Sequence, residues 1–397
     1  MSHRVYLPYN VMEAALNRMR WLFDEFENVL VSYSGGKDST VVYNLALQVA
    51  REKGRLPLQV FFLDQEAEWE ATIDQVKSIM YNPDVKPYWL QVPIKLFNAT
   101  SVTEHWLQCW APEDEDRWMR PHDPIAMTQN VYGTDRFHEF FRAFVRYHWP
   151  HTRTAQLTGV RAEESPNRRF GLTSYKTYKW VTWGSVIDKE QDHYTFHPLY
   201  DWSYMDIWKA IHENGWSYNA IYDFMYRYGV PVRNMRVSNV HHETAVHSLF
   251  MLQEIEPQTY ARLTQRIAGI DMAGKLGKDD YFVRQLPYMF ASWREYRDFL
   301  LDKLITEPTW KENFKRYFNR DELYFYPVAG ESLIRAHVNS ILTNDWEGVK
   351  IENMRAAINT EQYRVMGRDK WNAFKRERRE MEKRGERPPL TLLTPAS

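Results

Sequence analysis

The chain has 397 residues, of which 44% are hydrophobic and 26% charged, and its formal net charge is −1. This composition excludes a disordered chain, and the charge provides no overall attraction to nucleic acid or to a membrane. The only cysteine is Cys109, which excludes a disulfide within the chain and a cysteine-rich metal site, and no apolar run is long enough for a membrane span. We expect a cytoplasmic protein with two or three domains, or one large domain with insertions.

The first predicted helix begins at Asn10, which can cap it, and Glu13 stands three residues later as in a capping box. Apolar residues at positions 12, 15, 16, 19, 22 and 23 follow helical spacing. The apolar run at 29–31 then predicts a buried strand that ends at a glycine turn.

Residues 32–40 read Ser-Tyr-Ser-Gly-Gly-Lys-Asp-Ser-Thr and join this strand to a helix predicted from about Ser39 to Lys53. Two glycines without Cβ atoms let backbone N–H groups surround an oxyanion, and the start of the helix adds its positive dipole end. A Walker A loop is excluded, because Asp38 follows Gly-Lys where that motif has Ser or Thr. We predict a phosphate site in which Lys37 is the cation; a Gly-Gly turn with a polar helix cap is the alternative.

Strands and helices alternate after this loop. Residues 58–63 predict a buried strand that ends at Asp64, a helix follows to about Met80, and residues 88–92 predict a third strand. A tryptophan-rich insert at about 98–150 interrupts the pattern with a loop and a helix near 134–148, and residues 155–160 return as a strand. The alternation predicts an α/β fold, a parallel twisted sheet with helices on both faces.

A second motif, Gly-Val-Arg-Ala-Glu-Glu-Ser at 159–165, follows directly on that strand. It brings Arg161 to the carboxyl edge of the sheet, where open α/β sheets bind ligands and where a guanidinium can hold phosphate through two N–H groups. A surface turn held by ion pairs is the alternative. A third segment, 197–222, predicts a strand end, a helix capped by Ser203 and aromatic-rich helices, which by themselves indicate packing.

The composition changes near residue 240 to helix-forming stretches. We predict a nucleotide-binding α/β domain at 1–240, a mainly helical region at 241–387 and a disordered tail at 388–397. Residues 364–387 hold ten Lys or Arg against five Asp or Glu, so Arg364–Arg387 could contact nucleic acid with Trp371 and Phe374, although a solvated amphipathic helix is favoured. His242 and His247 are five residues apart and would diverge around a helix, so no zinc site is predicted.

Taken together, the three motifs resemble the phosphoadenosine phosphosulfate (PAPS) reductase superfamily, in which Ser-Gly-Gly-Lys-Asp-Ser is the PP-loop. The resemblance covers roughly residues 28–230. Asp64 matches the acidic residue that the family carries after its second strand, although the residues after it depart from the usual Asp-Thr-Gly. The long C-terminal extension is similar to the subgroup that includes the regulator IbrA.

The resemblance implies that ATP is cleaved between its α- and β-phosphates, so that pyrophosphate leaves and an unidentified acceptor is adenylylated. In that chemistry Lys37, Asp38 and Arg161 are the catalytic residues, and Asp38 or Asp64 would bind Mg²⁺. The expected nucleotide-binding set is Ser32, Ser34, Gly35, Gly36, Lys37, Asp38, Ser39, Thr40, Asp64, Gly159, Arg161, Glu164 and Ser165.

One departure from the superfamily limits the activity. Thiol-dependent reductases of this group carry a cysteine near the C-terminus and many bind an iron–sulfur cluster, but no cysteine follows Tyr222 here. We therefore expect neither thiol-dependent reduction nor an iron–sulfur cluster. Two alternatives stay open: an enzyme that binds PAPS or its product, and a non-catalytic nucleotide-sensing subunit that acts with a ParB-like partner.

Overall fold

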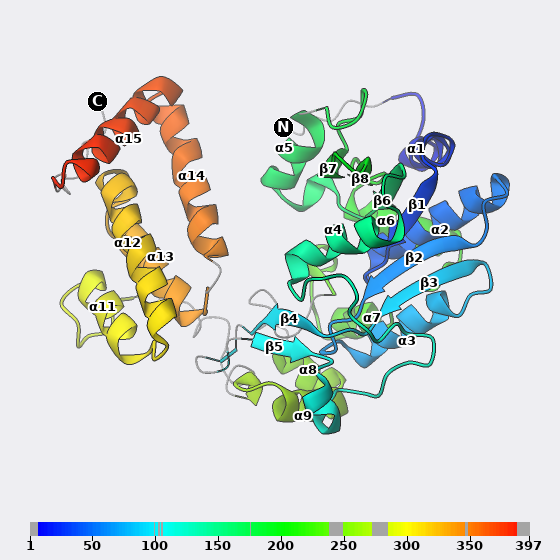
Figure 1. Cartoon of the computed structure of the whole chain (residues 1–397), viewed down its shortest axis with the longest axis horizontal. Helices are drawn as coiled ribbons and strands as arrows, with labels where there is room; N and C mark the ends of the chain where they lie inside the picture. The colour runs from blue at the N-terminus through cyan, green and yellow to red at the C-terminus, as the bar shows by residue number, and fades with distance from the viewer. Residues whose placement is uncertain are drawn as a thin grey trace. The chain divides into compact units, whose positions relative to one another are not determined.

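The computed structural model describes residues 7–98, 100, 101, 104, 106–174, 176–237, 249–271, 285–345 and 348–386 (Figure 1). The histidines at 242 and 247 and the tail at 388–397 lie outside these residues. The chain forms two compact units, one of residues 1–96, 108–240 and 251–266 and the other of residues 97–107, 241–250 and 267–397.

The first unit is built on a six-stranded sheet with the order β3-β2-β1-β6-β8-β7. These strands are β1 (Asn28–Ser32), β2 (Leu58–Leu63), β3 (Val85–Leu90), β6 (Thr154–Leu157), β7 (Gly184–Asp188) and β8 (His193–Phe196). Neighbours pair in parallel except β7 and β8, which are antiparallel. The predicted parallel sheet is confirmed, whereas β7 was not predicted. The chain runs outward from β1 to β3 and then returns to β6 on the other side of β1, which places a topological switch point between β1 and β6.

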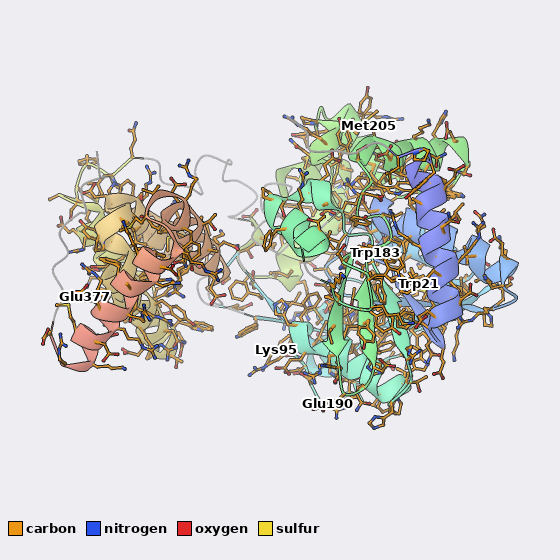
Figure 2. The ribbon with its side chains drawn as sticks, turned by 90° about the horizontal axis from the view of Figure 1, so that it is seen from above. Trp21, Lys95, Trp183, Glu190, Met205 and Glu377 are labelled. Carbon is orange, nitrogen blue, oxygen red and sulfur yellow. The ribbon has the colours of Figure 1, made fainter. Side chains whose placement is uncertain are left out.

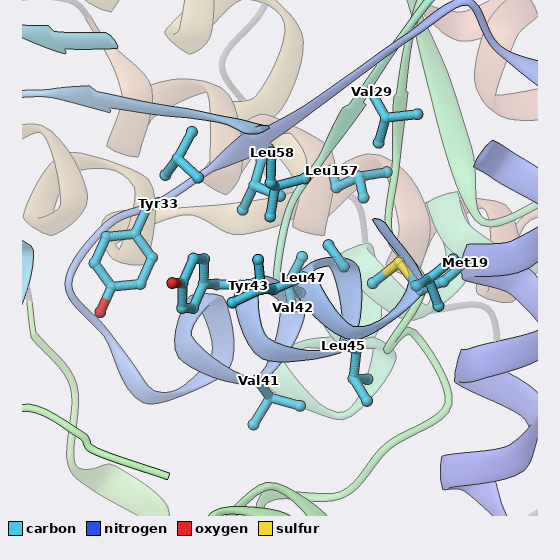
Figure 3. Packing of buried hydrophobic residues seen from close by; sticks show 14 of the residues in the cluster. Met19, Val29, Tyr33, Val41, Val42, Tyr43, Leu45, Leu47, Leu58 and Leu157 are labelled. Atoms are coloured by element: carbon cyan, nitrogen blue, oxygen red, sulfur yellow. The ribbon is translucent and has the colours of Figure 1, made fainter. Parts of the chain in front are cut away.

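Helices cover both faces of this sheet. On one face α1 (Val11–Glu25), α2 (Lys37–Glu52) and α3 (Glu70–Met80) share one apolar core with β1 and β2, part of which Figure 3 shows around α2. On the other face α4 (Phe137–His148) packs Phe144 against Phe61 at 4.5 Å between ring centroids. Phe61 points to α4 while its neighbours Val60 and Phe62 belong to the α2 core, as strand alternation requires.

Both predicted helix caps are present. Asn10 and Glu13 form a complete capping box at α1, and Ser203 with Asp206 forms another at α6 (Tyr204–Glu213). Near the end of α1, Trp21 packs edge-on against Trp183 at 6.1 Å, and Figure 2 labels both residues. Trp183 belongs to the apolar core of this unit, and Trp21 packs against that core.

The tryptophan-rich insert is more ordered than the predicted loop and helix. Besides α4, it contains β5 (Trp106–Cys109), which forms a two-stranded sheet with the preceding β4 (Ile94–Phe97), and the 3-10 helix η1 (Pro112–Arg117). The acidic run at 113–116 lies in η1, and its Asp114 binds Arg266 at 3.0 Å. Buried apolar residues such as Leu107 explain why the insert folds.

The C-terminal region is helical, as predicted. Its helices are α8 (Leu249–Ile255), α9 (Pro257–Arg266), α11 (Trp293–Lys303), α12 (Pro308–Ala329), α13 (Glu331–Leu342), α14 (Val349–Val365) and α15 (Arg368–Lys383). The basic helix α15 buries Trp371 completely, 6.3 Å from Phe325, so this tryptophan is not available to nucleic acid and the amphipathic-helix alternative is favoured. Within the described part of the chain, every helix is too short or too polar to span a membrane.

Candidate nucleotide site

The phosphate loop lies between the end of β1 and the start of α2. Gly35 adopts a φ of +72°, and a Cβ built on it would lie 2.6 Å from the Thr72 side chain, so only glycine fits. Gly36 is the N-cap of α2 and has no side chain to cap the helix, which leaves the positive end of α2 suited to an anion. The predicted strand, glycine turn and helix therefore have the geometry of a phosphate cradle.

The hydroxyl groups of the loop differ in what they contact. Ser39 and Thr40 are buried and both donate to the Gly36 carbonyl oxygen, at 2.9 and 3.0 Å. Ser34 is exposed, and its hydroxyl lies 3.1 Å from that of Ser39. Ser32, at the end of β1, accepts a hydrogen bond from the Gln156 amide. Ser39 and Thr40 thus hold the shape of the loop, while Ser34 has a hydroxyl at the surface where a ligand would meet it.

Asp38 joins the two cations that were predicted to act with it. Its Oδ2 atom accepts from Lys37 Nζ at 3.0 Å, and its Oδ1 atom accepts from Arg161 Nε at 2.6 Å. Lys37 and Arg161 are each 5% exposed, so these contacts are partly shielded from water. The structure brings Lys37, Asp38 and Arg161 together at the switch point between β1 and β6.

Gly159 makes this meeting possible. A Cβ atom at this position would lie 2.8 Å from the Asp38 carbonyl carbon and 2.9 Å from the Ser39 backbone nitrogen. Since these are backbone atoms of the first turn of α2, they cannot move aside as a flexible side chain could. The glycine therefore lets the chain after β6 approach the phosphate loop and deliver Arg161 to it.

The turn after Gly159 is held by its own carboxylates. Glu164, at the end of the 3-10 helix η2 (Ala162–Glu164), accepts from the Arg161 backbone N–H at 2.9 Å and pairs with Arg168 of α5 (Pro166–Ser174). The Ser165 hydroxyl accepts from the Arg168 backbone N–H at 3.1 Å. Glu164 and Ser165 shape the turn that presents Arg161.

Positive charge accumulates beside this turn. Burial, and then the neighbouring Arg236 and Arg161, lower the pKa of Arg168. Burial and, to a smaller extent, the charge of Arg168 lower the pKa of His197 to about 4. His197 is neutral near pH 7, and its Nδ1 atom lies 2.6 Å from the Thr158 hydroxyl. Arg161 and Arg236 are thus both close to Arg168, which makes this part of the sheet edge favourable to an anion.

Asn219 and Tyr222 support the loop, although sequence reasoning had treated their segment as packing. Asn219 Nδ2 donates to the Gly35 carbonyl oxygen at 3.1 Å and to the Thr72 hydroxyl at 2.9 Å. Tyr222, in α7 (Ile221–Arg227), accepts the Lys37 backbone N–H, and burial raises the pKa of its phenol. The sequence signal that could have identified both residues is the pattern Tyr218-Asn219…Tyr222 within the third predicted segment, 197–222.

Asp64 is fully engaged by the protein. Its Oδ1 atom accepts from Arg120 at 2.5 Å and from the Glu66 backbone N–H at 2.9 Å, and its Oδ2 atom accepts from Trp89 and Gln91, each at 2.9 Å. A carboxylate has about four acceptor positions, so none is left for a metal ion. Among the described residues no group of three or more His, Cys, Asp or Glu is arranged to hold one.

The loop after Asp64 is anchored by residues from beyond position 240. Arg266 of α9 binds the buried Glu66 through two contacts of 2.5 and 3.0 Å. Glu256 accepts the backbone N–H groups of Glu70 and Ala71, at 2.8 and 3.1 Å, and so caps α3. These contacts join residues 256–266 to the nucleotide-binding unit, and nothing in the local sequence indicates them.

Cys109 is buried, and its thiol donates to the Gln65 carbonyl oxygen at 3.2 Å. Burial and then the nearby Glu66 carboxylate raise the pKa of this thiol well above its usual value. Because the thiolate is the nucleophilic form, this cysteine is poorly suited to attack a substrate.

Comparison with known proteins agrees with the geometry of the loop. Residues 28–228 match the phosphoadenosine phosphosulfate reductase domain. The chain belongs to the PAPS reductase family. Residues 229–373 match a second family, described as a domain of unknown function (DUF3440). The family assignment therefore covers all three predicted motifs, and the region beyond them has a family of its own.

Three relatives illustrate the range of this family. The uncharacterized protein YbdN of Escherichia coli is 29% identical over 82% of this chain and 81% of its own length. Adenosine 5′-phosphosulfate reductase of Anoxybacillus flavithermus is 22% identical over 54% of this chain and 76% of its own. Sulfate adenylyltransferase subunit 2 of Shewanella loihica is 24% identical over 49% of this chain and 60% of its own.

Solved structures resemble the chain only distantly. FMN adenylyltransferase of Candida glabrata matches with a TM-score of 0.36 and 15% identity, over 60% of this chain and 66% of that protein. PAPS reductase of Candida auris matches with a TM-score of 0.29 and 13% identity, over 59% and 90%.

Proposed function

We propose that the chain binds ATP at the phosphate loop and cleaves it between the α- and β-phosphates. The observation that carries this proposal is the meeting of Lys37, Asp38 and Arg161 at the start of α2, beneath a glycine loop that suits an oxyanion. An ionised oxygen of the acceptor attacks the α-phosphorus, a new P–O bond forms, and the bond from the α-phosphorus to the bridging oxygen breaks. The electron pair stays on pyrophosphate, whose charge Lys37 and Arg161 stabilise.

Asp38 has a positioning role in this proposal. In the absence of ligand it pairs with both cations, offsets one of their two charges and keeps their side chains directed to the loop. A phosphate group that enters the site replaces part of this pairing with its own oxygens. The two cations are then already oriented, which lowers the cost of ordering them on binding.

Magnesium is not assigned to protein ligands. Each oxygen of Asp38 accepts from a cation and each oxygen of Asp64 accepts from two donors, so neither carboxylate fits a metal ion in these contacts. When Mg²⁺ is bound to the nucleotide, it neutralises phosphate charge.

A sulfonucleotide is the second candidate ligand. Arg168 and Arg236 lie near Arg161, and such further arginines suit a ligand with an additional anionic group. The relatives include a sulfonucleotide reductase and a sulfate adenylyltransferase subunit, so similarity to them does not favour one ligand over the other. A nucleotide-sensing role with a ParB-like partner, in the manner suggested by the IbrA-type resemblance, also stays a prediction.

Calorimetric titration separates these proposals. The purified chain is titrated with ATP and with PAPS, and pyrophosphate release is measured with ATP. We expect ATP to bind, and we expect Lys37→Ala to reduce its affinity at least tenfold through loss of a charge-assisted contact. Equal ATP affinity in Lys37→Ala would refute the site. ATP binding without pyrophosphate release, under any acceptor tested, would favour the sensing role.

A further inference from the structure

Glu68 is a nearly buried glutamate whose carboxyl group has no hydrogen-bond partner among the described residues. It is 6% exposed, and within the described part of the chain its carboxyl group makes no hydrogen bond. Asp64, four residues earlier, accepts hydrogen bonds from four donors. The two carboxyl groups of this loop therefore differ. All acceptor positions of Asp64 are occupied, whereas the carboxyl oxygens of Glu68 are available to a ligand.

The loop that carries Glu68 lies at the ligand-binding edge of the sheet. It follows β2, which pairs in parallel with the phosphate-loop strand β1. On its far side α3 begins, and Thr72 in the first turn of that helix touches Gly35 and shares Asn219 with it. Along the chain, Glu68 thus lies between the end of β2 and the first turn of α3, and that turn contacts the phosphate loop.

An unpartnered buried carboxyl group is costly to a protein. The pKa of Glu68 is raised to about 8. Burial is the main cause, the negative charge of Asp64 adds to it, and the positive charge of Arg120 offsets part of the increase. Arg120 donates to Asp64 and to the Glu66 carbonyl oxygen, and its Nε atom makes no hydrogen bond to Glu68. Buried polar groups without partners are uncommon, and those beside a ligand site are often completed by the ligand.

We propose that Glu68 is a nucleoside-recognition residue that accepts hydrogen bonds from the ribose hydroxyls of the bound nucleotide. This inference rests on the proposed function, since it assumes that phosphates occupy the loop after β1. In doubly wound α/β sheets, a ligand whose phosphates lie at the first loop extends its ribose to the end of the second strand, where an acidic residue receives the hydroxyls. Asp64 holds that position here, but all of its acceptor positions are occupied, whereas those of Glu68 are available.

The assignment also bears on the identity of the nucleotide. A ribose with free 2′ and 3′ hydroxyls offers two donors, and hydrogen bonds from these donors favour the ionised form of Glu68 over the protonated form that burial favours in the unliganded site. A 3′-phosphate instead brings negative charge towards Glu68 and the nearby Asp64. We therefore expect Glu68 to favour ATP over PAPS.

The test compares ATP with 2′-deoxy-ATP and 3′-deoxy-ATP in the full chain, by calorimetric titration. We expect removal of at least one hydroxyl to weaken binding by roughly tenfold in the wild type and by less than about threefold in Glu68→Gln. The matched control is Glu70→Gln, which changes an exposed carboxylate two residues later and should keep the wild-type discrimination. PAPS should bind the wild type more weakly than ATP.

Each other outcome overturns a defined claim. If ATP binds and the wild type does not distinguish the deoxy analogues, the assignment of Glu68 is wrong whether or not the variant folds. If Glu68→Gln still distinguishes ATP from its deoxy analogues as strongly as the wild type does, another residue binds the ribose hydroxyls. Tighter binding of PAPS than of ATP also contradicts the assignment. If ATP does not bind the wild type at all, the proposed function fails first, and this inference fails with it.

Discussion

The Tyr222 hydroxyl accepts the backbone N–H of Lys37 at 3.0 Å, although the two residues are 185 positions apart in the chain. The Lys37 ammonium also lies over the Tyr222 ring, with 5.5 Å between its Nζ atom and the ring centroid. The first turn of α2 is thereby held by a residue of α7, and the orientation of Lys37 depends on tertiary structure.

Tyr222→Phe should leave the Lys37 N–H unpaired while it keeps the aromatic ring. A buried donor without a partner costs about 1–3 kcal/mol, so we expect the free energy of unfolding to fall by that amount and ATP affinity to fall about three- to tenfold. Denaturant unfolding and calorimetric titration measure the two effects. Unchanged ATP affinity in the folded variant would show that the hydroxyl supports the fold alone.

Arg161→Ala should weaken binding of ATP more than binding of adenosine, by roughly 1.5–3 kcal/mol for a lost charge-assisted contact. Adenosine lacks the phosphates that the guanidinium would hold, so its affinity should change little. Arg20→Ala, which removes an arginine paired with Glu52 on the surface, is the control. Equal loss for both ligands would mean that Arg161 shapes the pocket and does not hold phosphate.

Gly159→Ala should disrupt the site, because the new Cβ atom would lie 2.8 Å from the Asp38 carbonyl carbon. Backbone shifts of this kind cost about 1–3 kcal/mol, and we expect ATP binding to be lost or greatly weakened. Gly171→Ala is the matched control, since no atom lies within 4 Å of its Cβ position and alanine favours a helix. Thermal unfolding and titration of both variants decide. A Gly159→Ala protein with normal affinity would contradict the close approach.

Glu68→Gln should stabilise the unliganded protein, and more so at higher pH. The pKa of Glu68 is about 8 in the folded protein and about 4.5 when unfolded, so between these values the unfolded chain releases a proton that the folded chain keeps. Stability of the wild type therefore falls as pH rises from about 4.5 to about 8, and the glutamine variant lacks this loss. We expect a gain of about 1–3 kcal/mol at pH 8 and little at pH 4.5. Denaturant unfolding at both pH values tests this, and a gain that does not depend on pH would point to packing.

Cys109→Ser should keep ATP binding and any nucleotide-dependent activity. The serine hydroxyl can still donate to the Gln65 carbonyl oxygen, although burial of a more polar group should cost about 1–2 kcal/mol of stability. Titration with ATP and a thermal unfolding scan are the measurements. Loss of activity in a variant that folds and binds ATP would restore a thiol to the mechanism.

Much of the site could be predicted because its signals are local. The glycine turn after β1, the lysine at the start of α2 and the arginine after β6 follow from strand ends, helix starts and the conformations that glycine permits. A parallel sheet then requires that the carboxyl ends of β1 and β6 meet at one edge, so Lys37 and Arg161 could be expected near each other. The caps at Asn10 and Ser203 were equally readable, because a capping box spans only four residues.

Other features depend on contacts between distant residues and were decided by the tertiary structure. Asp64 was a credible metal ligand until Trp89, Gln91 and Arg120 were seen to saturate it. Glu68 carries no motif, and only its burial without a partner distinguishes it from other glutamates. A sequence pattern records side-chain spacing along an element, whereas the protonation and availability of a carboxyl group depend on which donors and charges the fold places around it.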